Sequence, residues 1–312
     1  MNIALLKKIK TSRQGLLATV MSTEGHTYKK KGEKALFEVD DPFPVHGNIG
    51  SGCVDQEILR KGKDAFTTQK PTTVRIDTSD PSDVVFGYGV FCGGIIEILL
   101  EPVFENQKTI YRELLSMLEE RDHRLNKKPI YLAHDLDTGA ITLTREKPRS
   151  RDGVFIERVH PPSNLYIFGA TPLAHQITRF LEEMDFLIHI IDWRPGYLEK
   201  FEGVTHVRLH NECEITEESS LVLIFSHQFE RDRDVLKQAL LQRCAYIGLL
   251  SSPTRRDKIF DELEKEGVER SMFERISSPV GIDITSRSDP EIAVSIVAEL
   301  IRFKNGACDP PH

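Results

Sequence analysis

The sequence has few cysteines, no excess of positive charge and no long hydrophobic segment. Its 312 residues include five cysteines and one tryptophan, and the formal net charge is −7. A sparse, odd set of cysteines is typical of a reducing cytosol rather than of a disulfide framework. The negative charge argues against a nucleic-acid binder, and no apolar run reaches the ~18 residues that a membrane span needs. We therefore expect a cytoplasmic protein that binds neither nucleic acid nor a membrane.

Several motifs of common enzyme classes are also missing. The chain has no C-x-x-C pair and no H-E-x-x-H segment, so a dedicated zinc site is not expected. It has no G-x-S-x-G nucleophile elbow, which argues against a serine hydrolase of the α/β type.

The most informative stretch runs from Leu165 to Arg194. An apolar run meets Gly169, a helical pattern follows, and a second apolar run ends at Asp192. Asp192 lies 23 residues after Gly169, near the spacing of roughly 20 residues expected for the ribose-binding acid of a dinucleotide-binding crossover. However, Thr171 stands where the second glycine of that fingerprint is expected, and Pro172 removes a backbone donor. Thr171 and Pro172 instead predict a capped helix start.

The pattern around this crossover predicts an α/β protein with two domains. Residues 161–312 alternate aliphatic strands with helices, which predicts a Rossmann-like, doubly wound, mostly parallel sheet. Residues 1–160 mix strands and helices without a dinucleotide fingerprint and predict a mixed α+β domain. The segment Pro161-Pro162-Ser163 marks the expected boundary.

Two glycine-flanked cysteines are the candidate reactive groups of the first domain. Gly50-Ser51-Gly52-Cys53 precedes a predicted helix, whose N-terminus would favour a thiolate or a phosphate. Cys92-Gly93-Gly94 is a second turn of this kind, and the two thiols could line one pocket as sulfur carriers or metal ligands. The basic loop Lys29–Lys31 could hold a phosphate by its charge. The alternative is a pair of glycine turns with small buried cysteines and a solvated lysine loop.

In the second domain the candidates lie where strands end. Gly169, Thr171 and Asp192 belong to the crossover, and Ser226-His227 follow a predicted strand, where doubly wound folds place ligands. Asp192 could hold a hydroxyl or amine of a ribose or pterin. The alternative is a strand-end acid without a ligand.

Taken together, these segments resemble the XdhC/CoxI family, the accessory factors that mature xanthine dehydrogenase and related molybdenum hydroxylases. The resemblance rests on Gly50–Val54 and Cys92–Gly94 in the first domain. Further matching segments are Glu101-Pro102, Ile167–Ala170, Asp192–Arg194, Tyr246–Leu250, Ser278–Ile284 and Pro290–Glu299. Departures from the family pattern are Ser51, Asp55, Thr171-Pro172 and Ser251.

The resemblance implies a cytoplasmic homodimer that binds molybdenum cofactor (molybdopterin). It would help the cofactor receive sulfur from a cysteine desulfurase and pass it to an apo-xanthine dehydrogenase-type molybdoenzyme, as a maturation factor rather than a catalyst. Cys53 and Cys92 would be the catalytic and metal-binding thiols. The expected cofactor-binding residues are Gly50, Ser51, Gly52, Cys53, Gly93, Gly94, Gly169, Thr171, Asp192, Ser226, His227 and Gly248. Two alternatives stay open: an NAD(P)-dependent oxidoreductase, against which Thr171 argues, and a Rossmann-type nucleotide-sensing regulator.

Overall fold

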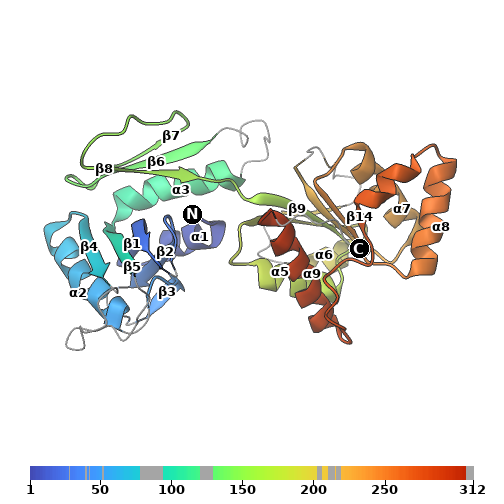
Figure 1. Ribbon diagram of the computed structural model, residues 1–312, viewed down its shortest axis with the longest axis horizontal. Coiled ribbons are helices and arrows are strands. Elements are labelled where there is room, and N and C mark those ends of the chain that lie inside the picture. The colour runs from blue at the N-terminus through green and yellow to red at the C-terminus, as the bar shows by residue number, and fades with distance from the viewer. Residues whose placement is uncertain are drawn as a thin grey trace. The chain divides into compact units, whose positions relative to one another are not determined.

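A computed structural model divides the chain into two units, Met1–Pro161 and Pro162–His312 (Figure 1). The structure describes residues 1–27, 29–38, 41, 43–50, 53–77, 94–119, 129–201, 206–209, 215 and 219–306. Each unit has a hydrophobic core of its own, and each is described separately below.

In its described ranges, unit 1 combines two antiparallel sheets with helices α1, α2 and α3. Its elements are α1 (Ile3–Thr11), β1 (Gly15–Gly25), β2 (Lys34–Glu38), β3 (Pro44–Gly47), α2 (Cys53–Thr68), β4 (Thr72–Asp77), β5 (Gly94–Val103), α3 (Glu105–Glu119), β6 (Ile130–Asp135), β7 (Ile141–Thr144) and β8 (Val154–Val159). The larger sheet has the order β3-β2-β1-β5-β4 and the smaller one β7-β6-β8.

Alternation along the strands gives the larger sheet two buried faces. One face packs on α2, with Phe37 and Ile98 from the sheet against Ile58 of the helix. The other face is mostly apolar but also carries Thr19 and Lys34, which are buried. Because both faces are covered, the strands are more uniformly hydrophobic than those of a sheet with one solvated side.

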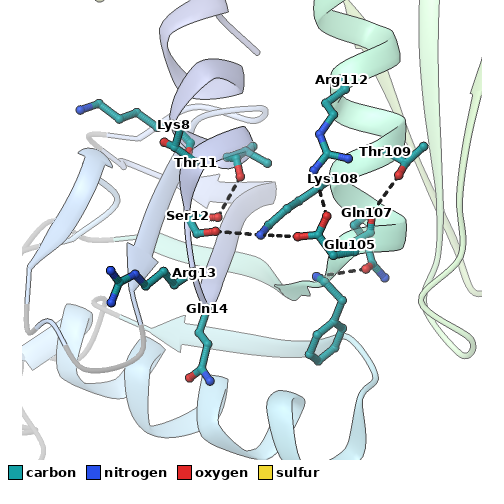
Figure 2. A network of polar contacts seen from close by, with 12 residues as sticks. Lys8, Thr11, Ser12, Arg13, Gln14, Glu105, Gln107, Lys108, Thr109 and Arg112 are labelled. Atoms are coloured by element: carbon teal, nitrogen blue, oxygen red, sulfur yellow. Dashed lines mark hydrogen bonds and ion pairs between the residues drawn. The ribbon is translucent and has the colours of Figure 1, made fainter.

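A buried lysine joins α1 to α3 (Figure 2). The Nζ atom of Lys108 donates to the carbonyl of Ser12, just beyond α1, at 2.7 Å and to Glu105 Oε1 at 2.8 Å. Arg112, one turn further along α3, reaches the other oxygen of Glu105 at 2.9 Å. The ammonium group therefore satisfies a backbone carbonyl where α1 ends, and it fixes the two helices against each other.

A second buried group of charges joins the two sheets of unit 1. His134 on β6 contacts Glu101 on β5 through Nδ1 and Oε1 at 2.8 Å. Glu157 on β8 pairs with Lys34 on β2 at 2.9 Å, and Lys34 also donates to Thr19 at 2.8 Å. Burial alone would lower the pKa of His134, but the charge and hydrogen bond of Glu101, together with Glu157, raise that pKa to about 9. The imidazole is therefore cationic between two carboxylates at neutral pH.

Unit 2 is built around one parallel sheet. Its elements are β9 (Ser163–Phe168), α5 (Pro172–Leu181), β10 (Phe186–Asp192), α6 (Pro195–Leu198), η1 (Glu199–Phe201), β11 (His206–Leu209), β12 (Leu221–Ile224), α7 (Phe229–Leu241), β13 (Tyr246–Leu249), α8 (Pro253–Lys265), η3 (Arg270–Arg275), β14 (Ile276–Ser277) and α9 (Asp289–Lys304).

The six strands follow the order β11-β10-β9-β12-β13-β14, and every pairing is parallel. Helices α5 and α9 contribute to the core on one face of the sheet, and α7 and α8 contribute to the core on the other. This is the doubly wound arrangement, in which the strand order reverses between β9 and β12. The predicted fold class is confirmed: a Rossmann-like unit accompanies an N-terminal mixed unit.

Two short strands, β3 and β14, have no counterpart among the elements that the sequence pattern predicts. The polar composition of Ser22–Glu33 favours a loop, but in the structure its first residues, Ser22–Gly25, continue β1 alongside β5. None of the helices in the described part of the chain is long and apolar enough to cross a membrane.

Candidate functional site

Strands β3 and β5, which border the predicted thiols in the sequence, end and begin toward the same end of the larger sheet in unit 1. Gly25, at the end of β1, pairs with Gly94, at the start of β5. Gly47, at the end of β3, pairs with Ala35, next to the start of β2. The two pairings are not adjacent, because Ala35 lies opposite Ala18 on β1 and Gly94 lies opposite Gly25.

Two glycines near this end of the sheet leave no space for a side chain. A Cβ atom on Gly94 would lie 2.5 Å from the Thr27 side chain and 2.6 Å from the Glu24 carbonyl oxygen. A Cβ atom on Gly50 would lie 2.3 Å from Val54 on α2. Both glycines are therefore needed for close backbone packing, and this packing accounts for them without a ligand.

Asp55 lies buried in the first turn of α2, beside Gly50. Burial raises the pKa of its carboxyl group, while a hydrogen bond from the Gly50 N–H and the charge of Lys29 act in the opposite direction. Its Oδ1 atom has no hydrogen-bond partner among the described residues. The charge of Lys29 has the smallest of these three effects on the carboxyl group.

The predicted residues Ser51, Gly52, Cys92 and Gly93 lie outside the described residues, as does the side chain of Cys53. Cys53 is the first residue of α2, so its backbone stands where the sequence pattern predicts it. Within the described ranges, no three His, Cys, Asp or Glu side chains are placed to hold a metal ion. The roles of Cys53 and Cys92 stay predictions.

In unit 2, the backbone N–H groups of the turn after β9 already form hydrogen bonds within the protein. The N–H of Gly169 donates to Ile191 and that of Thr171 to Gly169. The N–H of Ala170 donates to Asp192 Oδ2 at 2.8 Å. Thr171 caps α5 by accepting from Ala174, and Pro172 has no N–H. A pyrophosphate in the usual dinucleotide position would find these donors already occupied.

Gly169 itself is pressed against the neighbouring strand. Its φ is +125°, and a Cβ atom there would lie 2.7 Å from the Phe225 carbonyl oxygen. Glycine is therefore required for the turn to approach the chain after β12. This close approach lies at the switch point of the sheet.

Asp192, at the end of β10, accepts four hydrogen bonds. Arg194 donates its backbone N–H and Nε to Oδ1 and its Nη2 to Oδ2, each at 2.9 Å, and Ala170 completes the set. Burial would raise the pKa of Asp192, but the hydrogen bonds from Arg194 and Ala170 lower it below its usual value. Four donors fill the acceptor positions of a carboxylate. A ribose hydroxyl therefore finds no acceptor position here while these bonds are present.

Ser226 forms a second polar group at the same edge of the sheet. Its hydroxyl donates to Asp232 Oδ1 at 2.5 Å, and Arg255 Nη2 lies 2.6 Å from Asp232 Oδ2. Burial raises the pKa of Asp232, against the hydrogen bond from Ser226 and the charge of Arg255. His227 is exposed and has a φ of +62°, in the left-handed region. Ser226 and His227 thus lie at the predicted strand end.

Gly248 lies inside β13, in the body of the sheet. A Cβ atom there would be 2.6 Å from Val280 and 2.9 Å from Leu223. This position gives Gly248 a packing role between the sheet and the segment before α9. Its contact with a cofactor stays a prediction.

A group of aromatic and cationic side chains also lies at this edge of the sheet, and the sequence motifs do not predict it as a site. The guanidinium carbon of Arg194 lies 4.4 Å from the ring centre of Trp193 and 3.8 Å from that of Tyr197. Arg231 on α7 lies 4.7 Å from the same Trp193 ring. Trp193 and Arg194 belong to a sequence segment that resembles the family. Arg231 is distant from them in the sequence, and the fold brings it into contact with Trp193.

Two models of one protein family match the chain. The model described as "XdhC and CoxI family" matches residues 9–77, and the model described as "XdhC Rossmann domain" matches residues 165–300. The chain belongs to the XdhC/CoxI family. The resemblance inferred from the sequence motifs is thereby confirmed.

Relatives of this family match along most of the chain. A Bacillus subtilis protein named as a probable subunit of xanthine dehydrogenase is 23% identical, covering 95% of each chain. The Escherichia coli "Molybdenum cofactor insertion chaperone PaoD" is 21% identical, covering 98% of this chain and 90% of the relative. A crystal structure described as a xanthine dehydrogenase from Bacillus halodurans superposes with a TM-score of 0.77 at 26% identity, covering 99% of this chain and 98% of that one.

Two of the family-like segments in unit 2 hold each other in place. Glu299 on α9 accepts from the N–H of Gly281 and, at 2.5 Å, from the hydroxyl of Ser277. Ser295 on the same helix donates to the carbonyl of Ile282 at 2.6 Å. The segment Ser278–Ile284 is therefore fixed to α9 by side chains of the second motif, which gives both motifs a structural role.

Proposed function

We propose that this XdhC/CoxI family member is a maturation factor for molybdenum cofactor. It would bind the cofactor, support its sulfuration and deliver it to a hydroxylase of the xanthine dehydrogenase type. The observation that carries this proposal is the match to a molybdenum cofactor insertion chaperone over 98% of this chain. The partners proposed with it are the apo-hydroxylase, a cysteine desulfurase and a second copy of this chain.

One end of the larger sheet in unit 1 is the proposed place for the thiol chemistry. We base this on the strands that border the two thiols in the sequence, since β3 ends and β5 begins toward the same end of the sheet. Thiolates are suitable ligands for soft metals and suitable carriers of sulfur. The positive end of α2 would favour the thiolate form of Cys53.

Asp55 lies in the first turn of α2, the helix that begins at Cys53. Its carboxyl group is buried, and burial raises its pKa.

The test is reconstitution with defined components. The purified chain is mixed with released molybdopterin, and bound cofactor is measured after gel filtration. In parallel the chain is co-expressed with a candidate hydroxylase, and the sulfurated cofactor in that enzyme is quantified. We expect Cys53→Ala and Cys92→Ala each to lower both quantities by at least about tenfold, the loss of roughly one metal–ligand or charged contact.

Cys244→Ala is the matched control. Cys244 is buried in unit 2, and burial raises the pKa of its thiol to about 11, so it is protonated and unreactive at neutral pH. Full cofactor binding and full hydroxylase activation by both Cys53→Ala and Cys92→Ala would show that the thiol role is wrong. Failure of the unaltered chain to bind molybdopterin would reject the proposed function itself.

A further inference from the structure

Helix α9 carries apolar side chains outside the face that packs on the sheet of unit 2. The packed face includes the buried residues Ile296 and Leu300. Val294 lies outside this face and is 46% exposed, and Ala298 and Ile301 are partly buried. Because residues three and four positions apart share one face of a helix, these three side chains form an apolar outer stripe along α9.

Helices α7 and α8 of the same unit use their outer side chains differently. Arg233 on α7 donates to Glu262 on α8 at 3.0 Å, and Lys237 donates to Glu266 at 2.7 Å. The outer stripe of α9 has no charge. Neighbouring apolar side chains at a protein surface mark a contact with another surface, whereas charged side chains suit a solvated helix face.

Two opposite charges flank the outer stripe at its two ends. Glu291 lies in the first turn of α9 and Arg302 in the last, and both are exposed. They are eleven residues apart, which is about three turns, so they lie on the same side of the stripe. A hydrogen bond from the backbone N–H of Arg287 lowers the pKa of Glu291, so its carboxylate is charged at neutral pH.

The placement of these charges fits a second copy of α9 that runs in the opposite direction. A two-fold axis perpendicular to the helix exchanges the two ends of α9 and leaves each side chain on the same side of the stripe. Glu291 of each copy then faces Arg302 of the other, and the two stripes meet between them. A parallel pair would place each charge against its own kind, which is unfavourable.

We infer that the outer stripe of α9, Val294 with Ala298 and Ile301, is the contact surface for a second copy of this chain, bound as an antiparallel pair of helices. The inference rests on the proposed function in that a second copy is one of the partners named there. It adds the surface that binds this copy and the orientation in which it binds.

The contact would also act on the neighbouring segment Ser278–Ile284. Ser295 and Glu299 of α9 hold this segment by hydrogen bonds, and each of them follows a residue of the outer stripe in the sequence. A second copy packed on the stripe restricts the movement of α9, and through these bonds it restricts the segment.

Sedimentation equilibrium of the full chain over a wide range of concentrations tests the contact. We expect a dimer that Val294→Asp weakens at least about tenfold, because the carboxylate would be buried among apolar side chains. Leu241→Asp is the matched control, since Leu241 on α7 is 63% exposed and lies outside the outer stripe. A monomer at every concentration, an unchanged dimer in Val294→Asp or an equal loss in Leu241→Asp would overturn the inference.

Exchange of the two flanking charges tests the orientation. Glu291→Arg and Arg302→Glu each place like charges together and should weaken the dimer at least about tenfold. The double variant places opposite charges together again and should restore the dimer. Glu291→Arg loses the hydrogen bonds from the N–H groups of Arg287 and Ser288 in the single and the double variant alike, so restoration reports the charge pair. A double variant as weak as the single ones would contradict the antiparallel pair.

Molybdopterin binding by the same samples separates this inference from the proposed function. An unaltered chain that binds molybdopterin as a monomer would reject the contact and keep the function. A dimer that Val294→Asp weakens, in a chain that does not bind molybdopterin, would reject the function and keep the contact. A monomeric chain whose activation of the hydroxylase falls in Val294→Asp would assign the outer stripe to the hydroxylase and overturn the inference.

Discussion

At the scale of single residues, Asp192 and Arg194 hold the turn after β9 in place through hydrogen bonds. Asp192 is fully buried as a side chain, whereas that of Arg194 is 32% exposed. The carboxylate connects the turn through Ala170 to the chain after β10 through Arg194. In this position an acid at the end of the second strand stabilises the fold, while the same position in a dinucleotide-binding fold binds the ribose.

Replacing Asp192 by Asn is expected to destabilise unit 2 by about 2–3 kcal/mol. The amide NH2 group in place of Oδ2 would face the N–H of Ala170 and the Nη2 of Arg194, so both of these hydrogen bonds are lost and donors face donors. Urea unfolding followed by Trp193 emission measures the change. Asp185→Asn is the control, because Asp185 is 51% exposed and contacts only Lys304, at 3.7 Å, among the described pairs. Unchanged stability of Asp192→Asn would show that these hydrogen bonds do not stabilise unit 2.

Some of these residue roles can be predicted from the sequence and others cannot. The prediction that Thr171 caps α5 is confirmed, because a cap depends on residues three positions apart. The spacing of Asp192 after Gly169 is equally visible in the sequence. Arg194 occupies the acceptor positions of Asp192 only because of its side-chain conformation. Arg231 contacts Trp193 only because of the strand order. Neither leaves a local pattern in the sequence.

At the scale of elements, the junction of α1 and α3 depends on one buried ammonium group. Lys108 is 7% exposed at its side chain, whereas Arg112 is 43% exposed, and both contact Glu105 (Figure 2). Only Lys108 also satisfies the carbonyl of Ser12. The two cations therefore differ in burial. Removal of Lys108 would also leave the Ser12 carbonyl without this donor, and removal of Arg112 would not.

Replacing Lys108 by Met is expected to lower the free energy of unfolding by about 1–3 kcal/mol, because the Ser12 carbonyl would lose its donor inside the protein. Arg112→Met is the matched control, with an expected loss below about 1 kcal/mol, since an exposed ion pair contributes little. Chemical denaturation followed by circular dichroism measures both. Equal losses in the two variants would mean that the hydrogen bond to Ser12 does not stabilise the junction.

The elements that can be predicted from the sequence are those with long, uniform patterns. The aliphatic strands of unit 2 and the helices between them follow from alternation and from helix-start signals such as Thr171 with Pro172. Strands β3 and β14 have four and two residues, which is too short for a recognisable period. The pairing of Gly25 with Gly94 joins distant parts of the chain, so the shared end of the larger sheet in unit 1 is visible only in the fold.

At the scale of the whole molecule, the two units differ in how they respond to pH. In unit 1 the two sheets are joined by His134 and Lys34 against Glu101 and Glu157. The pKa of His134 rises from 6.5 to about 9 on folding. Its contribution to stability is therefore complete below pH 6.5 and is lost as the pH rises through about 9. The pKa of Glu157 is lowered, so its contribution is lost only below about pH 4.5, outside this range.

Between pH 6 and pH 9, unit 1 is expected to lose about 3 kcal/mol of stability, or roughly 6–12 °C in its melting temperature. Unit 2 should lose little in this range, because burial raises the pKa of Cys244 to about 11 and the loss from its thiol begins only near pH 9. Trp193 lies in unit 2, so its emission reports that unit alone. Calorimetry should therefore show one transition that falls with pH while the transition reported by Trp193 stays in place. His134→Gln should abolish the pH dependence and exposed His160→Gln should retain it; a pH dependence that persists in His134→Gln would assign the effect to another group.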